Sequence, residues 1–238
     1  MPITQKLGCV VDSVLPHGAG VYTVALKPER QAPRFRAGQF LHLALDPYDH
    51  TGFWPDSRAF SIASSPVDRE CIRITYAVHG RFTARMERDL VQGKRVWIKM
   101  PFGDFVIDEA SELVLFAGGT GITAFTAFLD ALPANTAMSV VLAYGARSTE
   151  LLIYRELVER CAARVPSLDV NYFVEAGASD VTDGTAGQLS VEAIWPRVRH
   201  PLDATYYLSG PPQMLRTISQ DLKGRGLGTE AIHIDAWE

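Results

Sequence analysis

A glycine-rich turn follows the most apolar run of the chain. Residues 113–117 read Leu-Val-Leu-Phe-Ala, and residues 118–121 read Gly-Gly-Thr-Gly. A buried parallel strand is continuously apolar, and glycines at its carboxyl end let the backbone approach a phosphate at the amino end of the next helix. The segment therefore predicts an anion cradle. A plain tight turn is the alternative, because the spacing departs from Gly-x-Gly-x-x-Gly.

Two shorter segments carry residue types that suit a flavin. Arg58-Ala59-Phe60-Ser61 offers a guanidinium for a diphosphate, a flat ring for an isoalloxazine and a hydroxyl for its edge. Gly80-Arg81-Phe82-Thr83 is a glycine turn into a short helix, where backbone amides and a hydroxyl can hold phosphate. Each segment has a structural alternative: an arginine beside a core aromatic residue is often only a solvated charge, and Thr83 is also a good N-cap.

The first hundred residues must supply the elements that position these two segments. Short β-rich runs alternate there with turn residues, and one short helix is expected over 83–90 with Thr83 as its N-cap. Six strands with so little helix predict an antiparallel barrel or sandwich. The expected strands are 9–15, 21–26, 40–45, 60–63, 71–78 and 95–100.

From residue 113 the pattern changes to alternating strands and helices, which predicts a parallel sheet with helices on both faces. The change places a domain boundary at Asp108, giving domains of 1–108 and 109–238, and the acidic segment 108–112 is predicted to be a solvated linker. The expected strands are 113–117, 138–144, 169–174, 205–208 and 232–234, and the expected helices are 122–132, 149–164 and 211–223.

Composition excludes several classes of protein. The chain has 238 residues, of which 47% are hydrophobic and 21% charged, and a net charge of −4 without a basic run, so nucleic acid is not an expected partner. No segment is apolar enough for a membrane span, and residues 1–6 lack the hydrophobic region of a signal peptide, which predicts a cytoplasmic location. Three widely spaced cysteines offer no metal or cluster motif, so redox chemistry would need an organic cofactor.

In their order and positions, these motifs resemble those of the ferredoxin–NADP reductase superfamily over nearly the whole chain. The resemblance rests on the arginine motif at 58–61, Gly38-Gln39-Phe40, the turn at 80–83, and Pro101-Phe102-Gly103-Asp104-Phe105. In the second half it rests on the glycine turn at 118–121 and on residues 207–214, Tyr-Leu-Ser-Gly-Pro-Pro-Gln-Met. It implies a two-domain protein, with an antiparallel six-stranded FAD-binding β-barrel followed by an α/β parallel-sheet nucleotide-binding domain.

The resemblance also implies roles for individual residues. Ser61, Ser209 and Trp237 would serve hydride transfer, with Ser61 near flavin N5 and Trp237 against the opposite flavin face. Phe60 stands where the family usually has tyrosine, which removes a hydroxyl partner for the flavin, and Ser209 stands where it often has cysteine, which removes a sulfur contact. The implied cofactor-binding residues are Arg58, Ala59, Phe60, Ser61, Tyr76, Val78, Gly80, Thr83, Gly118, Gly119, Thr120, Gly121, Arg147, Gly210, Pro211, Met214 and Trp237.

The expected reaction is hydride transfer from NAD(P)H to FAD, followed by electron transfer to a separate protein such as a ferredoxin, a flavodoxin or an oxygenase component. The alternatives are a reductase of free flavin, ferric complexes or quinones, and a non-catalytic subunit that relays electrons. NADH is the expected donor, because the segment after the second parallel strand offers one arginine, Arg147, while Glu175 and Asp180 follow the third strand.

Overall fold

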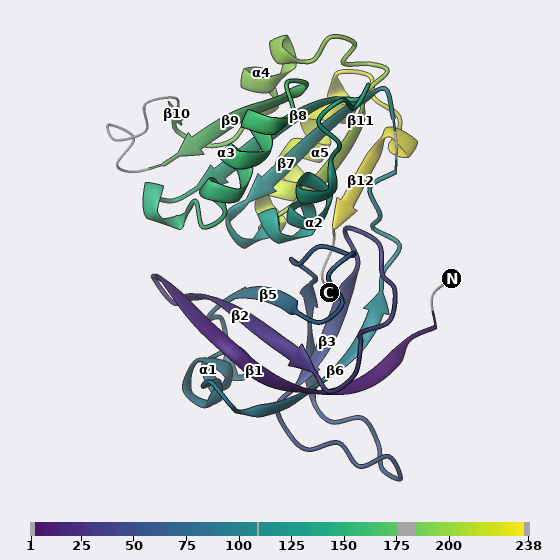
Figure 1. Cartoon of the computed structure of the whole chain (residues 1–238). Coiled ribbons are helices and arrows are strands. Elements are labelled where there is room, and N and C mark those ends of the chain that lie inside the picture. The colour runs from purple at the N-terminus through teal and green to yellow at the C-terminus, as the bar shows by residue number, and fades with distance from the viewer. Residues whose placement is uncertain (1–2, 109, 176–183, 236–238) are drawn as a thin grey trace. The chain divides into compact units, whose positions relative to one another are not determined.

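The chain folds into two compact units, Met1–Val106 and Ile107–Glu238, in a computed structural model. The structure describes residues 3–108, 110–175 and 184–235. The predicted fold class is confirmed: a six-stranded antiparallel sheet forms a nearly closed barrel in unit 1, and a six-stranded parallel sheet with helices forms unit 2 (Figure 1). The functions assigned to the two predicted domains stay a prediction. None of the described helices is long and apolar enough to span a membrane.

Unit 1 is a barrel with strand order β4-β3-β6-β1-β2-β5. The edge strands β4 and β5 are bridged just beyond β4, where the amide of Ala63 donates a 2.8 Å hydrogen bond to the carbonyl of Arg73. The elements are β1 (Gln5–Gly18), β2 (Val21–Pro28), β3 (Phe40–Ala44), β4 (Ser57–Ser61), β5 (Ile72–Ala77), α1 (Arg81–Asp89) and β6 (Arg95–Phe102).

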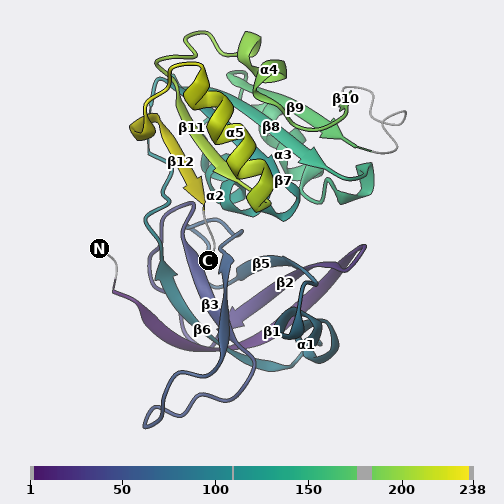
Figure 2. The same ribbon diagram turned by 180° about the vertical axis from the view of Figure 1, so that it is seen from behind.

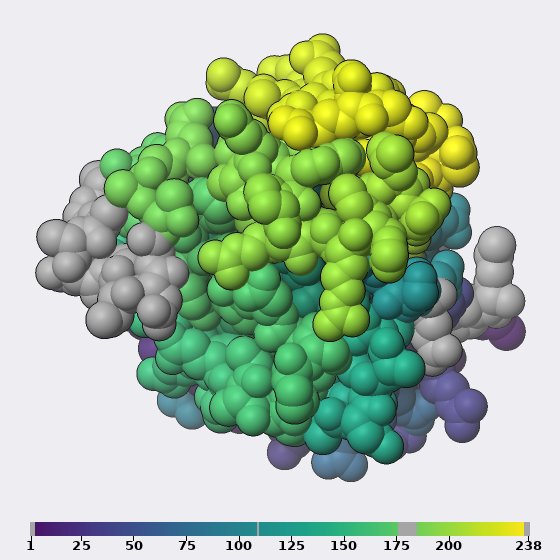
Figure 3. Space-filling model, turned by 90° about the horizontal axis from the view of Figure 1, so that it is seen from above, coloured from purple at the N-terminus to yellow at the C-terminus, as the bar shows by residue number. Residues whose placement is uncertain are grey.

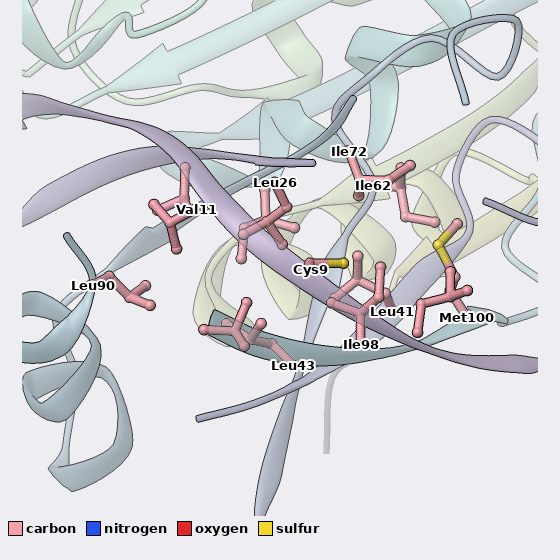
Figure 4. Packing of buried hydrophobic residues seen from close by; sticks show 14 of the residues in the cluster. Cys9, Val11, Leu26, Leu41, Leu43, Ile62, Ile72, Leu90, Ile98 and Met100 are labelled. Atoms are coloured by element: carbon pink, nitrogen blue, oxygen red, sulfur yellow. The ribbon is translucent and has the colours of Figure 1, made fainter. Parts of the chain in front are cut away.

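The barrel forms because its strands alternate between buried and exposed side chains. In β5, Ile72 and Ile74 are buried while Arg73 between them is exposed, as the period of two in a strand requires. Buried side chains from all parts of the barrel converge on one core, which Figure 4 shows for Cys9, Val11, Leu26, Leu41, Leu43, Ile62, Ile72, Leu90, Ile98 and Met100.

A buried amide ties two loops of the barrel together. Gln39 accepts from the amide of Arg36 at 2.9 Å and donates to the carbonyl of Gly103 at 3.1 Å. A side chain on Gly38 would lie 2.3 Å from the carbonyl oxygen of Phe105, and the φ of Gly38 is 92°, so this position requires glycine. The Gly-Gln-Phe and Pro-x-Gly-x-Phe motifs therefore hold the end of the barrel together.

Unit 2 has a sheet of order β10-β9-β8-β7-β11-β12, with every neighbouring pair parallel. Helices α2 and α3 lie on one face of this sheet and α4 and α5 on the other (Figures 1 and 2). The strands are β7 (Glu112–Gly118), β8 (Ser139–Ala146), β9 (Leu168–Val174), β10 (Gly184–Ala186), β11 (Thr205–Ser209) and β12 (Ile232–Asp235). The helices are α2 (Thr123–Ala131), α3 (Arg155–Arg164), α4 (Val191–Ile194) and α5 (Pro212–Gly224).

Strand β7 lies in the middle of the sheet because it is apolar on both faces, and all seven of its residues are buried. Glu112 opens this strand, and only 4% of it is exposed. Its carboxylate accepts hydrogen bonds from the amides of Arg199 and His200, each at 2.8 Å. Glu112 therefore does not belong to a solvated linker. Its hydrogen bonds fix the backbone of the segment around residues 190–210. This segment crosses the middle of the face seen in Figure 3.

Two predicted helices begin differently in the structure. The helix predicted over 149–164 divides into a 3₁₀ helix, Thr149–Leu151, and α3. The break lets both Leu152 and Tyr154 become buried, which two residues so spaced cannot do on one face of a continuous helix. Helix α1 begins two residues before Thr83, and its N-cap is Gly80, with a φ of 86°.

Candidate functional site

Unit 1 carries a groove of about 520 Å³ between β4 and α1. Arg58 comes from β4, and its guanidinium carbon lies 5.1 Å from the centre of the Phe82 ring on α1. Three further arginines, Arg81, Arg85 and Arg88, come from α1 at helical spacing. The groove is lined by Asp56, Arg58, Arg81, Phe82, Ala84, Arg85 and Arg88.

Carboxylates contact three of these arginines, including Arg88, whose Nε donates to Asp89 at 3.2 Å. Arg85 contacts both oxygens of Asp46, at 2.5 and 2.9 Å, and its Nε donates to Asp89 at 3.0 Å. These hydrogen bonds lower the pKa of both carboxyl groups. Arg58 donates to Asp56 at 2.6 Å and to the carbonyl of Ser57 at 2.8 Å.

The beginning of α1 has no capping side-chain hydrogen bond at its N-cap, Gly80. The Thr83 hydroxyl is engaged locally, accepting from the amide of His79 at 2.6 Å and donating to the carbonyl of Gly80 at 3.3 Å. The first amides of a helix are good anion donors, and the arginines of the groove add positive charge. This donor set fits a phosphate or diphosphate.

An aromatic trio lies beside the groove. The Tyr76 ring stacks on Tyr22 at 5.5 Å and meets the edge of Phe60 at 6.3 Å. Tyr22 reaches α1 through a 2.7 Å hydrogen bond to Glu87. The Tyr76 hydroxyl is buried and has no hydrogen-bond partner among the described residues, and burial raises its pKa. An unpartnered buried hydroxyl next to flat rings fits a planar ligand with polar edges.

The other predicted residues of unit 1 lie on neighbouring strands. Ala59 pairs with His42 of β3, and Ser61 pairs with Phe40 and is 8% exposed. Val78 is half-buried just after β5, where its amide donates to the carbonyl of Gly20.

Unit 2 brings its glycine turn against the end of β11. A side chain on Gly121 would lie 2.3 Å from the carbonyl oxygen of Ser209, and one on Gly118 would lie 2.5 Å from the sulfur of Met214 and 2.9 Å from Pro211. Two loops far apart in sequence thus meet at the carboxyl ends of adjacent strands, the usual place for a ligand on such a sheet.

Open space remains at the middle of this turn. Gly119 has a φ of 54°, and a side chain there would meet nothing within 4 Å. The hydroxyl of Thr123 donates to the carbonyl of Thr120 at 2.8 Å and fixes the turn as it enters α2. Gly210, with a φ of 155°, lies close to Gly118 across the two loops. The turn is a cradle whose backbone a phosphate can approach closely.

Beside the cradle lies a buried polar pair that the sequence did not reveal. Ser209 donates a 2.8 Å hydrogen bond to Asp235 of β12, and the two residues are 1% and 5% exposed. They are register partners of two parallel strands. Nothing in the local sequence around Asp235 indicates this pairing.

The comparisons with known proteins agree with this geometry. Residues 115–220 match the family described as oxidoreductase NAD-binding domain. The NAD(P)H-flavin reductase of Vibrio harveyi is 35% identical over 166 residues, which cover 65% of this chain and 67% of that protein. The chain belongs to the ferredoxin reductase-type family of FAD/NAD(P)H oxidoreductases. The predicted family, enzyme class and cofactor class are therefore confirmed.

More distant matches extend over the rest of this ferredoxin reductase-type chain. The toluate 1,2-dioxygenase electron transfer component of Pseudomonas putida is 28% identical over 196 residues, covering 81% of this chain and 56% of that protein. The FAD/NAD-binding domain of a nitric oxide dioxygenase from Vibrio cholerae shares the fold with a TM-score of 0.83 at 18% identity, covering 97% of this chain and 98% of that one. The chain spans between about half and two thirds of the curated relatives it matches.

The roles of all the predicted site residues of this ferredoxin reductase-type protein stay predictions. Trp237 and Asp180 lie outside the described residues. Arg147 and Glu175 are exposed just after β8 and β9. Five residues of the two sites were not predicted from the sequence: Asp56, Arg81, Arg85, Arg88 and Asp235. The spacing of the three arginines on α1 was a usable signal for them.

Proposed function

We propose that the chain catalyses the reduction of a flavin by NAD(P)H. The observation that supports this most directly is the presence of one phosphate-binding arrangement in each unit: the Arg58 groove in unit 1 and the Gly118–Gly121 cradle in unit 2. A bound flavin supplies the redox chemistry, since it accepts a hydride and releases electrons singly or in pairs.

The residues of the chain would bind and orient FAD and the nicotinamide nucleotide. Arg58 and the first amides of α1 would hold the diphosphate of FAD, and Phe60 and Tyr76 would face its ring system. In unit 2 the turn at Gly119 would hold the nucleotide pyrophosphate, while Asp235 fixes the hydroxyl of Ser209 at the end of β11. Hydride transfer between rings needs no general base, so orientation is the main task of the protein.

The proposal has two versions, which differ in the molecule that accepts the electrons from the flavin. Our leading version passes them from FAD to a separate protein such as a ferredoxin, a flavodoxin or an oxygenase component, supported by the similarity to the toluate dioxygenase electron transfer component. The second version releases reduced free flavin, or reduces ferric complexes or quinones. The similarity to the Vibrio harveyi flavin reductase and the engagement of Arg58 by Asp56 favour it.

The test is an anaerobic titration of the purified protein and FAD with NADH, and separately with NADPH, in which the loss of the visible flavin absorbance is measured. Turnover over many equivalents of flavin indicates a flavin reductase. Reduction of tightly bound FAD followed by oxidation on adding a ferredoxin-type acceptor supports the leading version. Absence of any flavin reduction by NADH or NADPH contradicts the proposed activity and leaves a non-catalytic subunit.

A further inference from the structure

The guanidinium on which the flavin site depends is already engaged by a carboxylate that lies just before its own strand. Asp56 precedes Arg58 by two residues, and its Oδ1 lies 2.6 Å from Nη1 of Arg58. Both side chains line the groove. An arriving phosphate therefore meets a guanidinium whose charge and Nη1 donor Asp56 already engages.

This engagement is readily exchanged. The Asp56 and Arg58 side chains are 66% and 54% exposed. Ion pairs exposed to this extent contribute little net free energy, so a diphosphate can displace the carboxylate. Breaking the contact between Asp56 and Arg58 has a small free-energy cost, which lowers the net affinity for the phosphate.

The other carboxylates near the groove have a different task. Asp46 and Asp89 hold Arg85 between them. Arg81, also in the wall, has no ion-pair partner among the residues that the structure describes. Asp56 is thus the carboxylate of the groove that engages the arginine expected to bind phosphate.

We infer that Asp56 competes with the flavin diphosphate for Arg58 and so keeps FAD exchangeable. The inference rests on the proposed function, and it assigns to Asp56 a role in setting affinity rather than in catalysis. The competition acts on phosphate, so it weakens binding of FAD and FMN and leaves riboflavin, which has no phosphate, unaffected.

The experiment compares Asp56→Asn with the wild-type protein by titrating FAD, FMN, riboflavin and inorganic pyrophosphate calorimetrically at low salt. Asp12→Asn is the matched control, because Asp12 is an exposed carboxylate on β1 of the same unit and lies outside the groove lining. We expect Asp56→Asn to bind FAD and pyrophosphate about two- to fivefold more tightly. The gain should shrink as salt is raised, and neither riboflavin binding nor the control should change.

A double-mutant cycle tests whether Asp56 acts through Arg58. In an Arg58→Ala background, Asp56→Asn should no longer improve affinity for FAD. Equal FAD affinity in Asp56→Asn and wild type, or an equal gain for riboflavin, overturns the inference while the proposed flavin reduction stands. If neither protein binds flavin or pyrophosphate, both the inference about Asp56 and the proposed flavin reduction are overturned. If Asp56→Asn binds pyrophosphate more tightly but neither protein binds a flavin, the competition for Arg58 is supported and a flavin is rejected as the ligand.

Discussion

Ser209 and Asp235 form a buried hydrogen bond of 2.8 Å between the carboxyl ends of β11 and β12. Asp235 loses a donor if Ser209 becomes alanine, and a buried carboxylate short of a donor costs about 1–3 kcal/mol. We expect Ser209→Ala to lower the free energy of unfolding by that amount in urea. Thr217→Ala, on the exposed face of α5, is the control. Equal stability of both variants would show that the pair does not support the sheet.

The glycine at position 121 is predicted to be irreplaceable. Gly121→Ala would bring a methyl group to 2.3 Å from the Ser209 carbonyl oxygen, so the two loops must separate. We expect loss of nicotinamide nucleotide binding and a destabilisation of about 1–3 kcal/mol. Gly224→Ala is the matched control, because a side chain there meets nothing within 4 Å. Nucleotide binding by Gly121→Ala at the wild-type affinity would exclude the cradle as its site.

Arg58 is predicted to supply a charged hydrogen bond to the flavin phosphates. Such bonds contribute about 1.5–3 kcal/mol, so Arg58→Ala should bind FAD about tenfold to a hundredfold more weakly. Quenching of flavin fluorescence measures the affinity. Arg34→Ala removes an exposed arginine of the same unit outside the groove lining and should leave affinity unchanged. If the two variants bind FAD alike, the diphosphate lies elsewhere.

NADH is the predicted donor. Arg147 is an exposed cation after β8, and the exposed Glu175 after β9 would repel a 2′-phosphate. The measurement is kcat/KM for NADH and NADPH under one set of conditions. A preference for NADPH of about tenfold, which corresponds to about 1.4 kcal/mol, would contradict the prediction and make Arg147→Ala the next variant to measure.

Acidification should lower the free energy of unfolding of unit 1 through its histidines. Burial lowers the pKa of His17, and burial together with the nearby Lys99 lowers the pKa of His42. The unfolded chain then takes up protons more readily than the folded one, so stability present at neutral pH is lost as pH falls through the ordinary histidine range. We expect unfolding midpoints to drop between about pH 7 and pH 5, and His42→Gln to reduce that drop. His79→Gln, at an exposed imidazole, should keep it.

Local patterns in the sequence determined the strands, the glycine turns and the order of the two units, because backbone preference and hydrophobic periodicity act within a few residues. The run into Gly118 predicted a buried strand and its turn, and β7 is buried throughout. The tertiary structure decided which polar groups meet. The burial of Glu112 and the pairing of Ser209 with Asp235 depend on strand register and on loops that return from distant segments. No local pattern carries that information, since such partners are fixed only when the chain packs.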